Sequence, residues 1–362
     1  MKQKKLRTLS HLLLPLMLFG GSANADGPRV VADIAPIHSL VSMVMDGVGQ
    51  PQLLVPQNIS PHHYSMRPSE AEALQEAKLV VYVGHDMSPW LEPVLETLAA
   101  SASALDLSKV DNIMQLAYRE GPIFADHDEA GHDDHDSHDD HDEAGHDDHD
   151  SHDDHDEAGH DDHDSHDDHD EKGHDDHDEE GHDDHAHHDH DGVDPHMWLD
   201  PMNAKLWLHA IASELTRIDP KNADRYDENA RSSSRTITLA MAQAEGHLAS
   251  GKDNGFLVYH DAYQYFEKRF NRVAVGSISL GDASKPSAKR LRELKVLFEE
   301  EGVSCVLTEP QYSSKIVDSV FGGFKPTVGV VDPIGIDLEL GATLYPELLE
   351  NIALSIAQCV NP

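Results

Sequence analysis

The stretch HDEAGHDDHDSHDD occurs three times in tandem, beginning at His127, His141 and His155. It belongs to a segment, residues 126–191, that holds 20 of the chain's 29 histidines and shows no apolar periodicity. Because such a segment buries almost no apolar surface, it cannot offset the entropy lost on ordering, and we predict that it is disordered without metal. The folded core must therefore be built from the sequence on either side of it.

On both sides of this segment, short apolar runs alternate with stretches of helical spacing. Residues 29–34 and 79–84 read as buried strands, and a helical pattern follows each of them. The same alternation of apolar runs and helical stretches occurs from residue 256 onward. This alternation predicts an α/β fold with mostly parallel sheets and with functional loops at the carboxyl ends of the strands. No basic patch points to a nucleic-acid partner.

The order of these patterns predicts two βα lobes joined by one long rigid helix. We expect an N-terminal lobe over residues 26–220, which contains the histidine-rich segment, and a C-terminal lobe over residues 251–362. Residues 221–250 have the composition of one helix, which would span roughly 40 Å if it is unbroken. Two α/β lobes joined in this way leave a cleft between them, where a ligand site is expected.

The N-terminus has the pattern of an export signal. The basic start MKQKKLR precedes the apolar run HLLLPLMLFGG, and Ala23 and Ala25 follow in an A-x-A arrangement. This order predicts a signal peptide over residues 1–25 that is cleaved near Ala25. The alternative, a membrane anchor, needs about 20 apolar residues. We therefore expect an exported protein.

Two cysteines, Cys305 and Cys359, lie in the C-terminal part of the chain. Disulfides persist in exported compartments, and an even pair without a further partner predicts one bridge. Two buried free thiols are the alternative interpretation.

Three histidines outside the repeat lie where strands or turns should open toward the cleft. His62 is in ISPHHYSMRPSE, His196 is in VDPHMWLDP, and His260 ends the predicted strand FLVYH. A single histidine is weak evidence for a metal site, because histidines serve many roles. Three around one predicted cleft, in an exported chain that also carries a histidine tract, indicate metal binding.

The motifs around these histidines are similar to those of a known family. PHHYSMRPS, DPHMWLDP and YHDAYQYFEKRF resemble, in this order, the three ligand motifs of the ZnuA family, the periplasmic solute-binding proteins of high-affinity zinc uptake ABC transporters. The run TEPQYSSKIVDSV and the later VDPIGIDLELGATLYPELL are also similar. A charged histidine-rich loop between the first two motifs is a feature of this family as well.

The resemblance implies that Zn²⁺ is bound by His62, His196 and His260. Neutral imidazoles suit Zn²⁺, and three of them leave the fourth position of a tetrahedron open. Some members use a Glu directly before the first histidine, where this chain has Pro61. Asp332, which matches an Asp used by related members, is the protein candidate for the fourth position, and water is the alternative. Glu309 is a possible hydrogen-bond partner for a ligating imidazole.

The histidine-rich segment is interpreted as an auxiliary collector that binds several ions loosely and keeps them near the cleft. A merely solvated acidic spacer is the alternative. The candidate residues of this segment are His127, His132, His135, His138, His141, His146, His149, His152, His155, His160, His163, His166, His169, His174, His177, His182, His185, His187, His188 and His190.

Together these patterns predict a monomeric periplasmic protein that captures Zn²⁺ and delivers it to the membrane permease of a zinc ABC transporter. It is expected not to be an enzyme. Three alternatives remain at this point: a manganese-selective member of the same fold, a zinc hydrolase with an open three-histidine site, and a storage protein in which the histidine tract does all the binding.

Overall fold

The computed structural model describes residues 27–62, 64–119, 121, 123–124, 192–249, 254–279, 286–300, 302–312 and 315–361. The predicted signal peptide and the histidine-rich segment lie outside the described residues. Two four-stranded parallel sheets with helices packed against them confirm the predicted α/β fold. None of the helices in these ranges is long and apolar enough to cross a membrane.

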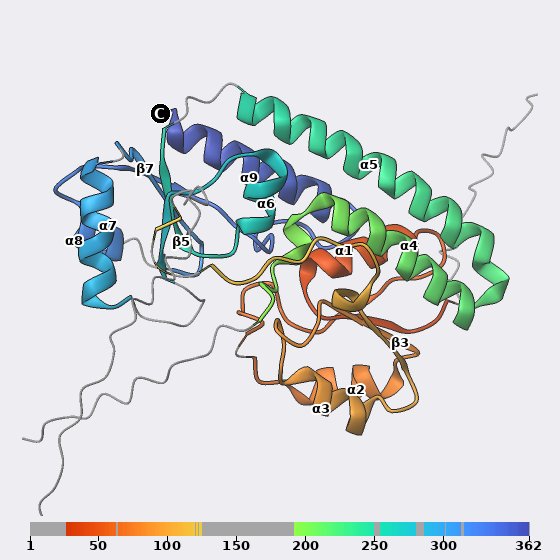
Figure 1. Ribbon diagram of the computed structural model, residues 1–362. Coiled ribbons are helices and arrows are strands. Elements are labelled where there is room, and N and C mark those ends of the chain that lie inside the picture. The colour runs from red at the N-terminus through yellow and green to blue at the C-terminus, as the bar shows by residue number, and fades with distance from the viewer. Residues whose placement is uncertain are drawn as a thin grey trace, which may run out of the picture. The chain divides into compact units, whose positions relative to one another are not determined.

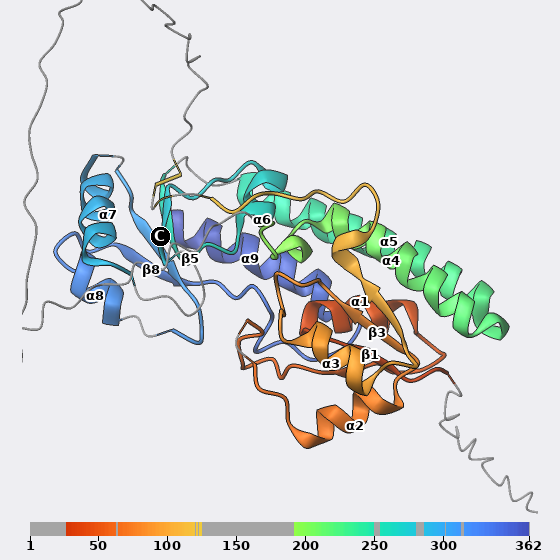
Figure 2. The ribbon, with the colours of Figure 1, turned by 60° about the horizontal axis from the view of Figure 1, so that its bottom comes forward.

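The first sheet lies between two layers of helices (Figure 2). Its elements, in chain order, are β1 (Val30–Ala32), α1 (Ala35–Val44), β2 (Gln52–Leu53), α2 (Pro68–Glu76), β3 (Leu79–Tyr82), α3 (Leu91–Leu98) and β4 (Ser103–Asp106). The strand order is β2-β1-β3-β4. Alternate residues of β3 pack against α1 and against the α2–α3 pair, which explains why this strand is apolar throughout.

The second sheet repeats this arrangement. Its elements are β5 (Phe256–His260), α6 (Gln264–Phe270), β6 (Gly276–Ser279), α7 (Ala288–Glu300), β7 (Cys305–Thr308), α8 (Lys315–Phe321), β8 (Thr327–Val330) and α9 (Leu344–Val360). The strand order is β6-β5-β7-β8. One face of the sheet packs against α7 and α8, and the other contributes to a core that includes α9. The central strand β5 ends at His260, so this candidate ligand lies at the carboxyl edge of the sheet.

The long helix predicted at residues 221–250 is α5 (Ala223–Ala249). It does not stand alone, because it packs along α9 and along α4 (Pro201–Ile218), as Figure 1 shows. Its buried face carries Ala230, Ala240 and Ala244, whose small side chains allow close helix packing. A single apolar core includes residues of α4, α5, α9 and both sheets, which makes the connection between the sheets stiff.

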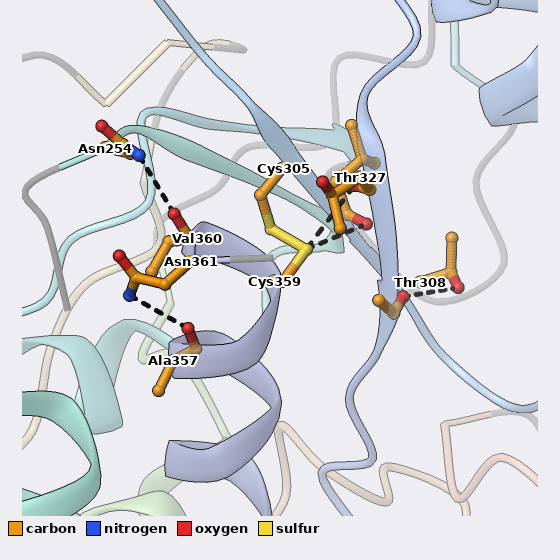
Figure 3. The surroundings of a disulfide bond; sticks show 10 residues. Asn254, Cys305, Thr308, Thr327, Ala357, Cys359, Val360 and Asn361 are labelled. Carbon is orange, nitrogen blue, oxygen red and sulfur yellow. Dashed lines mark hydrogen bonds between the residues drawn. A yellow bond between two sulfur atoms is a disulfide. The ribbon is translucent and has the colours of Figure 1, made fainter. Parts of the chain in front are cut away.

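The predicted disulfide between Cys305 and Cys359 is confirmed, and it ties β7 to the last turn of α9 (Figure 3). The Asn254 side chain also donates a 3.0 Å hydrogen bond to the carbonyl of Val360 at this helix end. Gly329 of β8 lies against the bridge, since a Cβ at that position would be 3.1 Å from the Cys359 sulfur. The C-terminal helix is therefore attached to the second sheet covalently as well as by packing.

The chain segments on either side of the histidine-rich segment pair with each other. Ala117 forms an antiparallel bridge with Val193, and the Asp194 amide donates a 2.8 Å hydrogen bond to the carbonyl of Leu116. Further along, Ile123 pairs with Gly276 of β6. We call this paired region, residues 116–119 and 192–194, the root of the insertion. The chain thus contacts the edge of the second sheet before it enters the histidine-rich segment.

Candidate metal centre

Three histidines from distant parts of the sequence lie together. His62 is in the turn between β2 and α2, His196 directly precedes the 3-10 helix η2 (Met197–Leu199), and His260 ends β5. One nitrogen of each imidazole lies within 4.8 Å of the others. The ring centroids of His196 and His260 are 4.9 Å apart, and that of His62 is 5.5 Å from His196. Such proximity of three imidazoles is the arrangement of a metal site rather than of an ordinary core.

The three imidazoles line a small pocket in which a single ion would fit. It leaves about 10 Å³ of free space, which is roughly the room needed by one water molecule. His196 and His260 are each 4% exposed, so an ion held by them would lose most of its contact with solvent. The lining residues are Pro61, His62, His196, Trp198, His260, Glu309, Gln311, Pro333 and Ile334.

The orientation of His196 is fixed by a buried carboxylate. Its Nδ1 lies 2.7 Å from Oδ1 of Asp194, which also accepts the backbone N–H of His196. The other oxygen of Asp194 accepts a 3.0 Å hydrogen bond from the side chain of Gln264 on α6. A carboxylate at Nδ1 holds the proton there and leaves Nε2 with its lone pair toward a metal. Sequence reasoning missed Asp194 and Gln264, although Asp194 lies only two residues before the histidine in VDPHMW.

A second carboxylate is next to His260. Oε1 of Glu309, at the end of β7, is 3.4 Å from Nδ1 of His260, and Glu309 is 1% exposed. Its Oε2 accepts a 2.6 Å hydrogen bond from the side chain of Gln311. The adjacent parallel strands β5 and β7 place both residues at the same sheet edge. Two of the three imidazoles therefore have a carboxylate close to Nδ1.

The turn that carries His62 is held by aromatic contacts. The indole N–H of Trp90 donates a 3.0 Å hydrogen bond to the carbonyl of Pro61, and the ring of Trp90 packs edge-on against Tyr64. The hydroxyl of Tyr64 donates a 2.6 Å hydrogen bond to Glu70 on α2. Burial raises the pKa of Tyr64 to about 12, so this hydroxyl remains a donor at neutral pH. The first sheet thus provides a fixed platform for His62.

Asp332, the residue that the sequence suggested for the fourth position, forms hydrogen bonds outside the pocket. Its carboxylate accepts hydrogen bonds from the backbone amides of Ile334, Gly335 and Ile336, and it closes the turn after β8. It does not line the pocket. Within the described residues, the group whose ligand atoms come together consists of the three histidines alone.

Part of the pocket lining, Pro333 and Ile334, comes from the turn that Asp332 closes. The indole N–H of Trp198 donates a 2.8 Å hydrogen bond to the carbonyl of Pro333, and the hydroxyl of Tyr345 donates to the carbonyl of Trp198 at 2.7 Å. Trp198 is 1% exposed and its ring centroid lies 5.3 Å from that of His196. An apolar wall of this kind excludes water and strengthens the binding of a charged ligand.

An ion network lies beside the root of the insertion. Arg119 forms ion pairs with Asp261, the residue after His260, and with Glu267 on α6. Its guanidinium also lies 3.6 Å above the ring of Phe124. Burial raises the pKa of the Glu267 carboxyl to about 7, while the neighbouring Arg119 acts in the opposite direction. Arg119 therefore balances two carboxylates that are almost completely buried.

Comparison with known proteins identifies the family of the chain. The family profile described as "Zinc-uptake complex component A periplasmic" (ZnuA) matches residues 30–359. The high-affinity zinc uptake system protein ZnuA of Brucella suis biovar 1 (strain 1330) is 39% identical over 342 residues, which are 94% of each chain. The protein of the same name from Haemophilus influenzae is 37% identical, and the alignment covers 99% of each chain.

Solved structures share the fold at lower identity. A crystal structure of ZnuA aligns with a TM-score of 0.65 at 21% identity, covering 92% of this chain and 99% of that one. The solute-binding protein FpvC of Pseudomonas aeruginosa, in complex with Mn²⁺, aligns with a TM-score of 0.65 at 16% identity, covering 92% of this chain and 98% of that one.

Two four-stranded parallel sheets and a small pocket lined by three histidines are the features of a solute-binding protein whose solute is a metal ion. The chain belongs to the ZnuA family of periplasmic zinc-uptake components, which the profile match along the sequence and the relatives above 30% identity show. This family consists of periplasmic solute-binding components of zinc uptake, which are not enzymes. The zinc hydrolase alternative is thereby set aside.

Proposed function

We propose that this protein captures Zn²⁺ in the periplasm with high affinity and presents it to the permease of a zinc ABC transporter. The observation that carries the proposal is the meeting of His62, His196 and His260 around a pocket of ion size. Three neutral nitrogen ligands suit Zn²⁺, whereas Mn²⁺ prefers sites rich in oxygen. The names of the relatives, which are zinc uptake proteins, support the same ion over manganese.

In this proposal the three histidines bind the ion through the nitrogen that faces the pocket. Asp194 accepts the Nδ1 proton of His196, and the carboxylate of Glu309 lies 3.4 Å from Nδ1 of His260. These two negative charges increase the basicity of the ligands and offset part of the charge of the ion. Water takes the fourth position. Asp332 is the alternative ligand, and it would first have to give up its hydrogen bonds to three backbone amides.

The cellular context follows from the same assignment. Residues 1–25 act as a signal peptide that is removed near Ala25, and the mature protein works in the periplasm as a monomer without a nucleic-acid partner. Its macromolecular partner is the membrane permease, to which the loaded protein docks. The histidine-rich residues 126–191 collect zinc loosely and raise its local concentration for the tight site.

A zinc-bound crystal structure with anomalous scattering at the zinc edge tests the site directly. We expect one strong peak at bonding distance, about 2.0–2.1 Å, from a nitrogen of each of the three histidines. A peak held by other residues, or the absence of a peak in a crystal grown with excess zinc, would refute the assignment.

Deletion of residues 126–191 is expected to separate two classes of zinc site. The deletion variant should bind one zinc ion with the affinity of the full chain's tight site, while the additional weaker ions are lost. The reason is that the three proposed ligands are all outside the deleted segment. Competition titration against a chelating dye, together with metal analysis of the dialysed protein, measures both classes. Loss of the tight class on deletion would support the storage alternative instead.

Zinc affinity of the deletion variant is expected to fall as the pH is lowered from about 7.5 to about 5.5. Imidazoles protonate near pH 6.5 in unstructured peptides, and each ligand must lose its proton to bind. Below that range the affinity should therefore fall by more than tenfold per pH unit, because several protons are displaced together. Titration at fixed ionic strength provides the measurement. A flat profile would mean that the ligands are not histidines.

A further inference from the structure

Arg119 has contacts that link the root of the insertion to Asp261, the residue after His260. It lies in the root of the insertion, next to the residues that pair with 192–194. Its Nε donates to both carboxylate oxygens of Asp261, at 3.1 and 3.2 Å, and its Nη1 donates to Glu267 at 2.6 Å. The side chains of these two acids are 7% and 2% exposed, so the bonds are shielded from water. Buried, charge-assisted and multidentate bonds of this kind fix side chains firmly.

Asp261 directly follows His260, at the point where β5 ends. The chain turns sharply there, since the amide of Ala262 donates a 2.9 Å hydrogen bond to the carbonyl of His260. The direction of the His260 imidazole depends on this turn, because the residue after a strand end sets the local backbone path. A guanidinium that holds Asp261 in place therefore also restrains the backbone on the C-terminal side of His260.

Helix α6, which carries Glu267, also contacts Asp194, the residue that orients His196. Gln264 donates to Asp194, which orients His196, and also to the carbonyl of Ala117 in the root at 3.0 Å. Tyr265 donates to the carbonyl of Asp194 and accepts from the amide of Leu116, at 2.8 and 2.9 Å. The root is thus attached to α6 at several points, and Arg119 is the point with buried charges.

We propose that Arg119 is a positioning residue for zinc binding, which holds the turn after His260 through Asp261 and so ties the root of the insertion to the metal site. This inference rests on the proposed zinc site. It does not require that any residue of the histidine-rich segment itself binds zinc. The competing interpretation is that Arg119 only stabilises the fold and does not affect the coordination geometry of the ion.

The test compares Arg119→Gln and Asp261→Asn with a matched control, Arg269→Gln. Arg269 is on α6, the helix that also carries Glu267. It makes a similar paired contact with the buried Asp200, at 2.7 and 2.8 Å, but it does not contact a residue adjacent to a histidine of the pocket. All variants are made in the full chain. Zinc affinity is measured by competition titration, and Co²⁺ is used as a spectroscopic substitute whose visible spectrum reports ligand geometry.

We expect Arg119→Gln and Asp261→Asn to weaken the tight zinc site at least tenfold, which is the usual scale for loss of a partner of a metal ligand. Both variants should also shift the Co²⁺ spectrum. Arg269→Gln should lower the unfolding temperature but retain the native affinity and spectrum. Arg119→Lys should bind with an intermediate affinity, because an ammonium keeps the charge without the planar fork.

The inference would be overturned if Arg119→Gln and Asp261→Asn had a lowered unfolding temperature but native zinc affinity and a native Co²⁺ spectrum. Arg119 would then have a role in stability alone. Equal losses in Arg269→Gln would overturn the inference as well. His260→Ala serves as the reference: if that variant keeps the tight site, the proposed zinc site itself is wrong. Should Arg119→Gln fail to fold, Asp261→Asn and Arg119→Lys decide the question, because both keep a polar partner in the network.

Discussion

Replacement of His260 by alanine in the variant that lacks residues 126–191 is expected to weaken zinc binding by roughly a hundredfold or more. Structural zinc sites contribute about 10–16 kcal/mol, so each of four ligands carries on the order of 3 kcal/mol. His260 comes from the second sheet, while His62 comes from the first and His196 follows the insertion. The variant keeps two imidazoles and loses the ligand supplied by β5.

The measurement is competition titration with a chelating dye at fixed pH, and the thermal shift produced by zinc provides an independent readout. Asp332→Ala is the informative comparison. Its carboxylate closes a turn, so this variant should lose stability while its zinc affinity falls less than that of His260→Ala. Equal affinity of His260→Ala and the parent would contradict the site. A larger loss in Asp332→Ala would favour Asp332 as a ligand over water.

Removal of the disulfide by replacing Cys305 and Cys359 with serine is expected to lower the free energy of unfolding by about 4 kcal/mol. The two residues are 54 positions apart, and the chain-entropy estimate for a loop of this length is near that value. Both sulfurs are buried between β7, β8 and α9, so the serine hydroxyls would add a cost for polar burial. The unfolding temperature should fall by about 10 °C.

Thermal unfolding of the zinc-free protein, with and without a reductant, gives this difference without a mutation, and the serine variant should match the reduced parent. Zinc affinity at low temperature is expected to remain native in both, because the bridge lies away from the residues that line the pocket. An unchanged unfolding temperature after complete reduction would contradict the expected contribution of the bridge.

Much of the fold was predictable from local sequence. The strand FLVYH corresponds to β5 residue for residue, and the long helix was placed within two residues at its start. Continuous apolar runs and helical spacing are strong signals because they arise from burial on both sides of a parallel sheet and along one helix face. The half-exposed edge strand β4 (Ser103–Asp106) was not predicted, since its residues alternate weakly in polarity.

The candidate site was predictable only in part. The three histidines are marked by their motifs and by their places after strands or turns, so sequence alone brought out His62, His196 and His260. Sequence alone also suggested Asp332. In the structure this carboxylate accepts hydrogen bonds from the backbone amides of its own turn. An acid followed by Pro-Ile-Gly closes such a turn locally, whatever lies across the pocket.

The sequence by itself determined the α/β alternation, the cysteine pair and the three imidazoles, because each depends on local pattern or on residue type. The tertiary structure decided which distant groups hold the carboxylates beside those imidazoles. The bond from Gln264 to Asp194 spans 70 positions and the bond from Arg119 to Asp261 spans 142. No local pattern encodes such contacts, since they exist only once packing of the two sheets and α6 has brought the segments together.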